Sequence, residues 1–169
     1  MLNLLKKSKL GLMIFLSAIL LTYCSPSESY KLENNREKWK SQNISHYSFV
    51  IVWLAFGPRE VAGKPVRIEV LNGKRVALEC LDCELPETDF FDDLDTAEKL
   101  FDRVQSSIAA KPYSLSIIYD DDLGYPVSIS GENHGPRVTD DSWSIRISQF
   151  KVIDGSGSES PDPPLPRVG

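Results

Sequence analysis

Two cysteines stand close enough in the sequence for redox chemistry: Cys80 and Cys83 form a C-x-x-C pair. In an oxidising compartment such a pair is either a disulfide or the centre of a thiol–disulfide oxidoreductase. A redox cysteine needs a stabilised thiolate, which a helix N-terminus or a nearby cation supplies. The neighbours here are Glu79, Asp82 and Glu84, whose negative charge disfavours a thiolate. We therefore expect a disulfide between Cys80 and Cys83, with an oxidoreductase as the alternative.

A zinc site is not expected from the ligands that the sequence offers. Structural zinc takes four nitrogen or sulfur ligands, often as two cysteine pairs. Only one such pair is present, and His46 and His134 lie far from it in the sequence.

The acidic run Asp120–Asp122 could suggest calcium, but an EF-hand loop needs glycine at its sixth position and glutamate at its twelfth. Counted from Asp120, these positions hold Tyr125 and Gly131. We predict no metal site and no cofactor. Weak calcium binding by Asp120–Asp122 together with Asp140 and Asp141 is the alternative.

Nucleophilic catalysis has no recognisable centre either. The serines of the second half of the chain alternate with apolar residues, as on the wet face of a sheet. There is no G-x-S-x-G elbow and no glycine-rich phosphate loop. We therefore name no catalytic residue and do not expect an enzyme.

The N-terminus has the pattern of an export signal. Lys6, Lys7 and Lys9 precede the uncharged, mostly apolar run Leu10–Leu21, which is the order of a secretory signal. As a helix this run spans about 18 Å, short of a bilayer core of about 30 Å. It ends in Leu-Thr-Tyr-Cys, which resembles the lipobox of bacterial lipoproteins, although a small residue is usual where Tyr23 stands. We predict a lipoprotein signal peptide over residues 1–23, lipidation at Cys24 and a polar tether over 24–34; an ordinary signal peptide is the alternative.

Charge excludes some classes of partner. The chain carries 19 basic and 24 acidic residues, a net charge of −5, and removal of the three lysines of the signal takes it to −8. A non-specific nucleic-acid binder needs a basic surface, as does adsorption to anionic lipid by charge alone. We therefore expect no nucleic-acid partner.

Hydrophobic periodicity predicts the elements of one domain over residues 35–153. A short helix is expected at 35–42, followed by strands at 46–56, 66–70 and 76–80, with Asn72-Gly73 as a hairpin turn. Val76, Leu78 and Cys80 are expected to face inward. Asp93 or Asp95 should cap a long helix at about 97–108, and strands follow at 113–119, 127–130 and 143–147. Residues 154–169, rich in Gly, Ser and Pro, are predicted to be a disordered tail.

These elements predict an α+β fold. Five to six antiparallel strands, in the order β-β-β-α-β-β-β, should pack on one long helix, preceded by the short N-terminal helix. The predicted core comprises Trp39, Tyr47, Phe49, Ile51, Trp53, Leu100, Phe101, Val104, Ile117, Tyr119 and Ile145.

The string Tyr-Asp-Asp-Asp-Leu-Gly-Tyr-Pro at residues 119–126 carries a family resemblance. It resembles the YD-x-x-x-GYP hallmark of a family of bacterial secreted and lipoprotein domains, domain of unknown function 6174, over about residues 38–150. The hallmark positions are Tyr119, Asp120, Gly124, Tyr125 and Pro126. Many members carry a close cysteine pair in the first long strand, which is absent here. The resemblance implies an exported, single-domain α+β protein and no particular activity.

Together these features predict a protein of the cell envelope, held at a membrane (outer membrane or cell surface) by lipid on Cys24. We expect a non-enzymatic binding or structural module with a protein partner that the sequence does not identify. The alternatives are an oxidoreductase that uses Cys80 and Cys83, and an inhibitory module that captures peptides on exposed sheet edges.

Overall fold

This computed structural model describes residues 26–54, 62–84, 89–135 and 141–153. The predicted signal peptide (1–23), the lipidation site Cys24 and the predicted tail (154–169) lie outside the described residues. The described elements are α2 (Glu28–Ser41), β1 (His46–Leu54), β2 (Pro65–Leu71), β3 (Lys74–Cys80), α3 (Ala97–Ala110), β4 (Ser114–Tyr119), β5 (Pro126–Glu132) and β6 (Ser142–Val152). No helix in these ranges is long and apolar enough to cross a membrane.

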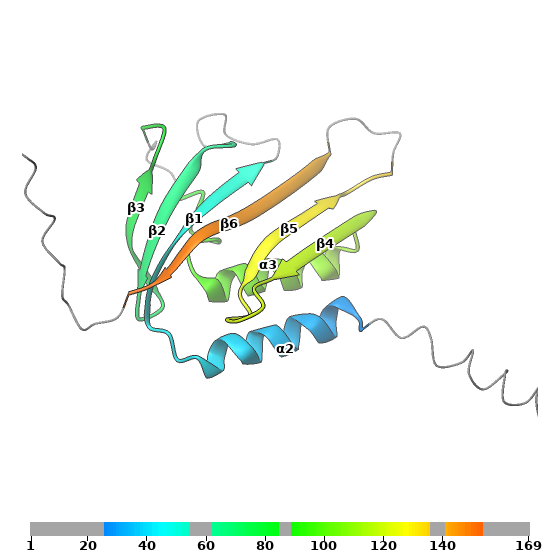
Figure 1. Ribbon diagram of the computed structural model, residues 1–169. Coiled ribbons are helices and arrows are strands. Elements are labelled where there is room, and N and C mark those ends of the chain that lie inside the picture. The colour runs from blue at the N-terminus through cyan, green and yellow to red at the C-terminus, as the bar shows by residue number, and fades with distance from the viewer. Residues whose placement is uncertain (1–25, 55–61, 85–88, 136–140, 154–169) are drawn as a thin grey trace, which may run out of the picture.

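The strands form a single antiparallel sheet in the order β3-β2-β1-β6-β5-β4. This confirms the predicted α+β class and its antiparallel sheet, for which five to six strands were expected. Both helices lie against the same face of the sheet, and the other face is left without a helix (Figure 1). We call these the helix face and the open face.

The core lies between the helices and the helix face. Strand β1 is central, paired with β2 on one side and β6 on the other, and its Tyr47, Phe49 and Ile51 are almost fully buried. The predicted core residues are buried, except that Trp53, Ile117 and Tyr119 are partly buried and pack at its margin. Burying a large apolar side chain contributes about 1.5–3 kcal/mol, so this layer is the main stabilising element.

The prediction for the N-terminal helix was wrong in its bounds. Helix α2 begins at Glu28, with the Ser27 hydroxyl accepting a hydrogen bond from the Tyr30 N–H, so residues 28–34 are helical and not a tether. It has 14 residues, as many as α3, so the fold has two long helices. Only Leu32 and Trp39 of α2 are buried. They lie seven residues apart, which is two turns along one side of the helix. Two apolar residues in a polar segment do not form an apolar stripe, so the sequence did not reveal the full length of the helix.

Helix α3 buries Leu100, Phe101 and Val104 as its apolar spacing predicts. Its N-cap is Thr96, whose hydroxyl accepts from the Lys99 N–H, and not Asp93 or Asp95. Asp95 is instead buried, and its carboxylate pairs with Lys99 at 2.7 Å and with Arg75 of β3 at 3.3 Å.

The Asn72-Gly73 hairpin is confirmed, with φ of +50° and +71°, the left-handed conformation that a two-residue hairpin turn needs. The return strand then departs from the expected alternation. Val70 pairs with Arg75 but Glu69 pairs with Ala77, which leaves Val76 as the extra residue of a bulge. Val76 is therefore 54% exposed. The prediction that it faces inward was wrong.

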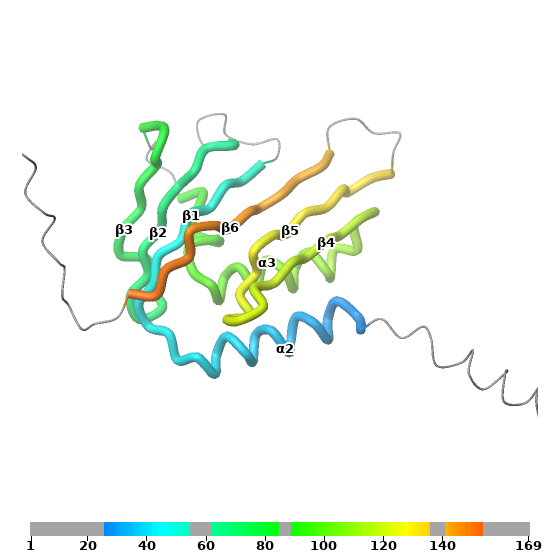
Figure 2. The backbone as a smooth tube through the Cα atoms, viewed as in Figure 1, coloured from blue at the N-terminus to red at the C-terminus, as the bar shows by residue number. Residues whose placement is uncertain are grey.

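A second bulge shapes β6. Gln149 has a φ of +50°, and the register with β1 shifts between Ser48 and Val50. The strand bends toward its C-terminal end (Figure 2). Ile145 and Ile147 face the core by simple alternation. The extra residue puts Phe150, and not Gln149, next on that face.

Candidate functional site

The hallmark residues form a tight turn between β4 and β5. The Asp120 carboxylate accepts hydrogen bonds from the N–H groups of Asp122 (3.0 Å) and Leu123 (2.7 Å). The Asp120 N–H donates to the Tyr125 carbonyl, and the Gly124 N–H donates to the Asp120 carbonyl. Asp120 is thus the acceptor that closes the turn, a role that aspartate commonly has.

Helix α2 packs directly on this turn. Gly124 has a φ of +84°, and a Cβ at this position would lie 2.8 Å from the Asn35 carbonyl oxygen and 3.1 Å from Cβ of Lys38. The Lys38 ammonium also donates to the Asp121 carbonyl. Glycine is required here both for its conformation and for the close approach of the helix.

The side chain of Tyr125 enters an aromatic cluster, which we define as Trp39, Tyr47, Phe49, Tyr125 and Phe150. Tyr125 stacks on Phe150 with ring centroids 4.2 Å apart, and Trp39 meets Tyr47 edge to face at 5.3 Å. Such pairs add about 0.5–1.5 kcal/mol beyond the area they bury. The hallmark therefore joins α2, β1 and β6 in one packing unit.

Glu98, in the first turn of α3, ties this cluster to the second helix. Its carboxylate accepts from the Trp39 indole N–H at 2.9 Å and from the Tyr47 hydroxyl at 3.5 Å. The Tyr47 hydroxyl in turn accepts from the Ala97 N–H at 2.9 Å, satisfying a donor that the helix itself leaves unpaired. Burial, assisted by the charge of Glu98, raises the pKa of Tyr47 well above its usual value. The buried Tyr47 hydroxyl thus has structural partners on α3 and is not presented to a ligand.

Cys80 and Cys83 are joined by a disulfide, with Cα atoms 5.4 Å apart, as predicted. The bridge lies at the end of the edge strand β3, where the Leu81 N–H donates to the Pro65 carbonyl. Glu79 beside it is paired with Arg67. The pair itself is on a strand end, and not at a helix N-terminus of the kind that activates a redox cysteine.

The two histidines lie at opposite ends of the sheet. His46 pairs with Glu69 at 2.7 Å, at the start of β1. His134 pairs with Asp141 at 2.8 Å, just beyond β5, and no serine hydroxyl of the described residues hydrogen-bonds to its ring. The geometry therefore brings no serine–histidine pair together within the described ranges.

The acidic residues considered for calcium do not converge either. The Asp120 turn precedes β5 and Asp141 lies beyond its other end, a separation of about 20 Å for a seven-residue strand. Asp140 lies outside the described residues. Among the residues that are described, no group of three or more His, Cys, Asp or Glu is placed to hold a metal.

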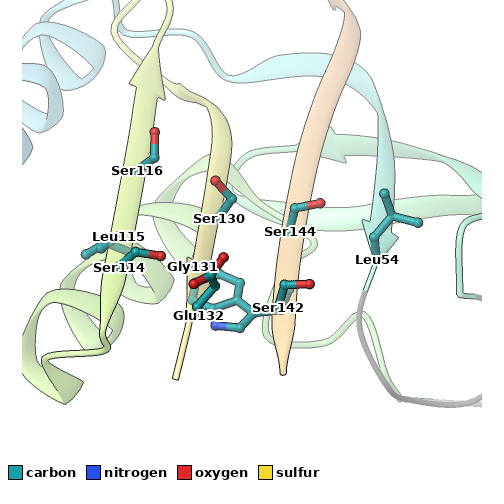
Figure 3. Close-up of a pocket in the computed structure, with 10 residues that line it drawn as sticks. Leu54, Ser114, Leu115, Ser116, Ser130, Gly131, Glu132, Ser142 and Ser144 are labelled. Carbon is teal, nitrogen blue, oxygen red and sulfur yellow. The ribbon is translucent and has the colours of Figure 1, made fainter. Parts of the chain in front are cut away.

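A hollow of the described surface lies on the open face, over β4, β5 and β6. It has a volume of about 520 Å³. Ser116, Ser130 and Ser144 are paired across the three strands, and Ser144 is paired with Leu54 of β1. A second row places Ser114, Glu132 and Ser142 side by side. Figure 3 shows the hydroxyls of both rows on one surface, which we call the serine hollow.

The sequence predicted that these serines face water but not that they gather in one hollow. The signal was their repetition at alternate positions in three successive strands. Only the strand register turns that repetition into two rows of hydroxyls, and Glu132 and Leu54 had no signal of their own.

The fold and these sites define a small α+β domain with one helix-covered face and one hydroxyl-bearing open face. Its sequence matches the model of a family described as a family of unknown function (DUF6174) over residues 31–152, and the chain belongs to that family. The match runs from the first half of α2 to the end of β6. No curated protein matches the chain, and no solved structure does.

The contact between Gly124 and α2 makes a first prediction. Gly124→Ala should lower the free energy of unfolding by about 2–4 kcal/mol, because a strained φ is combined with a steric overlap. Gly73→Ala is the matched control, since its φ is also positive but nothing lies within 4 Å of the added Cβ; it should cost about 1 kcal/mol. Urea unfolding measures both. Equal losses in the two variants would contradict the packing of α2 on the turn.

The buried tyrosines make a second prediction. Burial, with a contribution from Asp120, raises the pKa of Tyr125 to about 12, and burial, with a contribution from Glu28, raises that of Tyr119 to about 12. Unfolded tyrosines ionise near pH 10.0, so above this pH only the unfolded state loses these protons and stability falls as pH rises toward 12. Each such tyrosine contributes about 1.4 kcal/mol of loss per pH unit.

Tyr125→Phe should therefore make the loss of unfolding free energy between about pH 10 and pH 12 shallower by one tyrosine's share. Urea unfolding of the variant and of wild type at several alkaline pH values measures the slope. Tyr113→Phe, at a ring that is 64% exposed, is the control and should leave the slope unchanged. If Tyr125→Phe had the same slope as wild type, folding would not raise the pKa of Tyr125, and the prediction would be contradicted.

Proposed function

We propose that this chain is an exported, lipid-anchored binding protein of the cell envelope, without catalytic activity of its own, and that the serine hollow binds a neutral glycan. The observation that carries the proposal is the gathering of five serine hydroxyls on the one sheet face that the helices leave open. The lipid anchor rests on the sequence pattern ending at Cys24.

The chemistry of the hollow favours a polyhydroxylated ligand. A serine hydroxyl both donates and accepts hydrogen bonds, so an array of them matches sugar hydroxyls, which do the same. Glu132 adds a carboxylate that can accept from two neighbouring hydroxyls. No basic residue lines the hollow, which disfavours phosphates, nucleic acids and other anions.

The geometry of the hollow suits an extended ligand. Paired residues on neighbouring strands lie about 4.8 Å apart, so the row from Ser116 to Leu54 spans about 14 Å. The volume falls within the range of about 300–1,000 Å³ that is typical of ligand sites. Serine hydroxyls supply most of the polar groups of the hollow, and Leu54 adds an apolar end to the row; this row of hydroxyls favours a sugar chain over a lipid or drug-like ligand.

The position of α2 sets how the domain would be held. Because α2 begins at Glu28, only three residues separate it from Cys24, and they span at most about 11 Å. A lipid on Cys24 would therefore keep the domain close to the bilayer surface, and the tether predicted over residues 24–34 is shortened to the residues before α2.

The oxidoreductase alternative is supported less well. The disulfide lies at a strand end among Glu79, Asp82 and Glu84, and negative charge raises the cost of forming a thiolate. We therefore assign the disulfide a structural role at the end of β3.

Binding of soluble neutral oligosaccharides tests the proposed ligand. Cellohexaose, chitohexaose and maltohexaose are titrated calorimetrically into the chain, and at least one of them should bind. Ser130→Val removes the central hydroxyl and should weaken that binding about tenfold or more, from the lost hydrogen bond and the group it leaves unpaired. Ser148→Val is the matched control, because Ser148 is on the same face of β6 but outside the hollow. Absence of binding to any glycan, or equal effects of the two variants, would contradict the proposal.

The mass of the intact protein from its native host tests the anchor. The expected mass is that of a chain beginning at Cys24 with acyl groups attached. Cys24→Ser should abolish the added mass and release the protein from the membrane fraction. A native chain that retains residues 1–23, or that begins elsewhere without lipid, would contradict the anchor but leave the glycan site to stand on its own test.

A further inference from the structure

The two edges of the sheet differ in how well they are protected against pairing with another strand. Edge strand β3 carries Lys74 and Arg75, is distorted by the bulge at Val76 and ends at the Cys80–Cys83 disulfide. Charges and bulges of this kind are common protections of sheet edges.

The opposite edge strand, β4, has none of these protections along its length. Its sequence Ser-Leu-Ser-Ile-Ile-Tyr contains no charge and no proline. The register shift with β5 occurs only at its last residue. Ile118, on the open face, is 56% exposed. One side of β4 is hydrogen-bonded to β5, and no strand of the described residues pairs with the other side.

We propose that β4 pairs antiparallel with β4 of a second copy of this chain, about a two-fold axis at Ser116. Residues directly opposite in an antiparallel pair point to the same face, so a two-fold axis perpendicular to the sheet must pass midway between the two copies of one residue. Centring on Ser116 joins the two six-stranded sheets into one. Strand addition of this kind is a general mode of association through free sheet edges.

The regular pairing of β4 with β5 covers Ser114–Ile118, so Ser116 is the midpoint of the undistorted part of the strand. Charge complementarity favours the antiparallel direction. The nearest charges are Lys111 before β4 and the acidic run Asp120–Asp122 after it. An antiparallel pair brings the start of one β4 next to the end of the other, so Lys111 of each copy lies near the acidic run of the other, and Lys111 and Asp121 are both exposed in the single chain. The two-fold symmetry makes the favourable contact twice.

The side chains that meet are also complementary. On the open face Ser114 lies opposite Ile118 of the second copy, which removes that exposed isoleucine from water. On the helix face Leu115 lies opposite Ile117, and both are only partly buried in the single chain. Apolar burial therefore accompanies the backbone hydrogen bonds.

The pairing would have a consequence for the open face. The serine hollow reaches the edge strand at Ser114 and Ser116. In the pair, the row Ser144–Ser130–Ser116 would continue without a break into the same row of the second copy. A six-residue strand pair is a small interface, so we expect a reversible dimer. Anchoring of both copies to one membrane would raise their effective concentration.

Sedimentation velocity over a wide range of protein concentration tests the pairing. Wild type should pass from monomer to dimer as concentration rises. Ile118→Lys places a charge at the free edge and should raise the dimer Kd at least tenfold. Val76→Lys is the matched control, because Val76 is 54% exposed on the other edge strand, and it should leave the Kd unchanged. Circular dichroism verifies that both variants remain folded.

The register has a test of its own. Ser116→Cys should form an intermolecular disulfide on mild oxidation, because the two cysteines would face each other across the axis. Ser114→Cys should not, since Ser114 lies opposite Ile118 and its own copy is four residues further along the strand. Lys111→Glu should weaken the dimer about three- to tenfold, and Asp121→Lys in the same chain should restore it.

A chain that stays monomeric at all concentrations would overturn the proposal, including one that instead captures an added foreign peptide at β4. A dimer that Val76→Lys weakens as much as Ile118→Lys would also overturn it. A dimer sensitive to Ile118→Lys but cross-linked through Ser114→Cys would overturn the register at Ser116.

Discussion

The packing of α2 on the turn between β4 and β5 is the contact on which the rest of the structure depends. Gly124 allows the helix backbone to approach, and Asp120 closes the turn that holds Gly124 in place. Trp39 then reaches the aromatic cluster, where it contacts Tyr47, Tyr125 and Phe150. Because the Trp39 indole also donates to Glu98 of α3, this one contact orients both helices. The hallmark of the family is in this sense a packing site for a helix.

The asymmetry of the sheet follows from this arrangement. Both helices are used on one face, so the open face has only its own side chains to interact with water or a ligand. In the half of the sheet formed by β4, β5 and β6 they include the five serines and Glu132 of the serine hollow, with Arg146 on the same face of β6. In the other half, Arg67 and Glu69 of β2 are charged. A hydroxyl-rich surface next to an unprotected edge strand is the combination from which we infer both a ligand class and a self-association mode.

Much of the fold could be predicted because its signals are local. Strand β1, the Asn72-Gly73 turn and the apolar stripe of α3 each follow from residues close together in the sequence. Helix α2 could not be delimited, because its burial depends on Leu32 and Trp39 meeting partners far along the chain. Val76 and Phe150 departed from simple alternation because bulges shift them. Phe91 and Tyr125 are core residues supplied by turns, where no periodicity marks them. The serine hollow likewise needs the register between strands, which no single strand contains.

The account predicts that the turn is structural and that the open face is where a ligand binds. Mapping of backbone amide chemical shifts by NMR, as a neutral oligosaccharide is titrated into the chain, tests this most directly. The largest changes should occur at Ser116, Ser130 and Ser144, and the amides of the Tyr119–Pro126 turn and of α2 should stay in place. Changes centred on the turn or on α2, with the serine rows unaffected, would contradict the account.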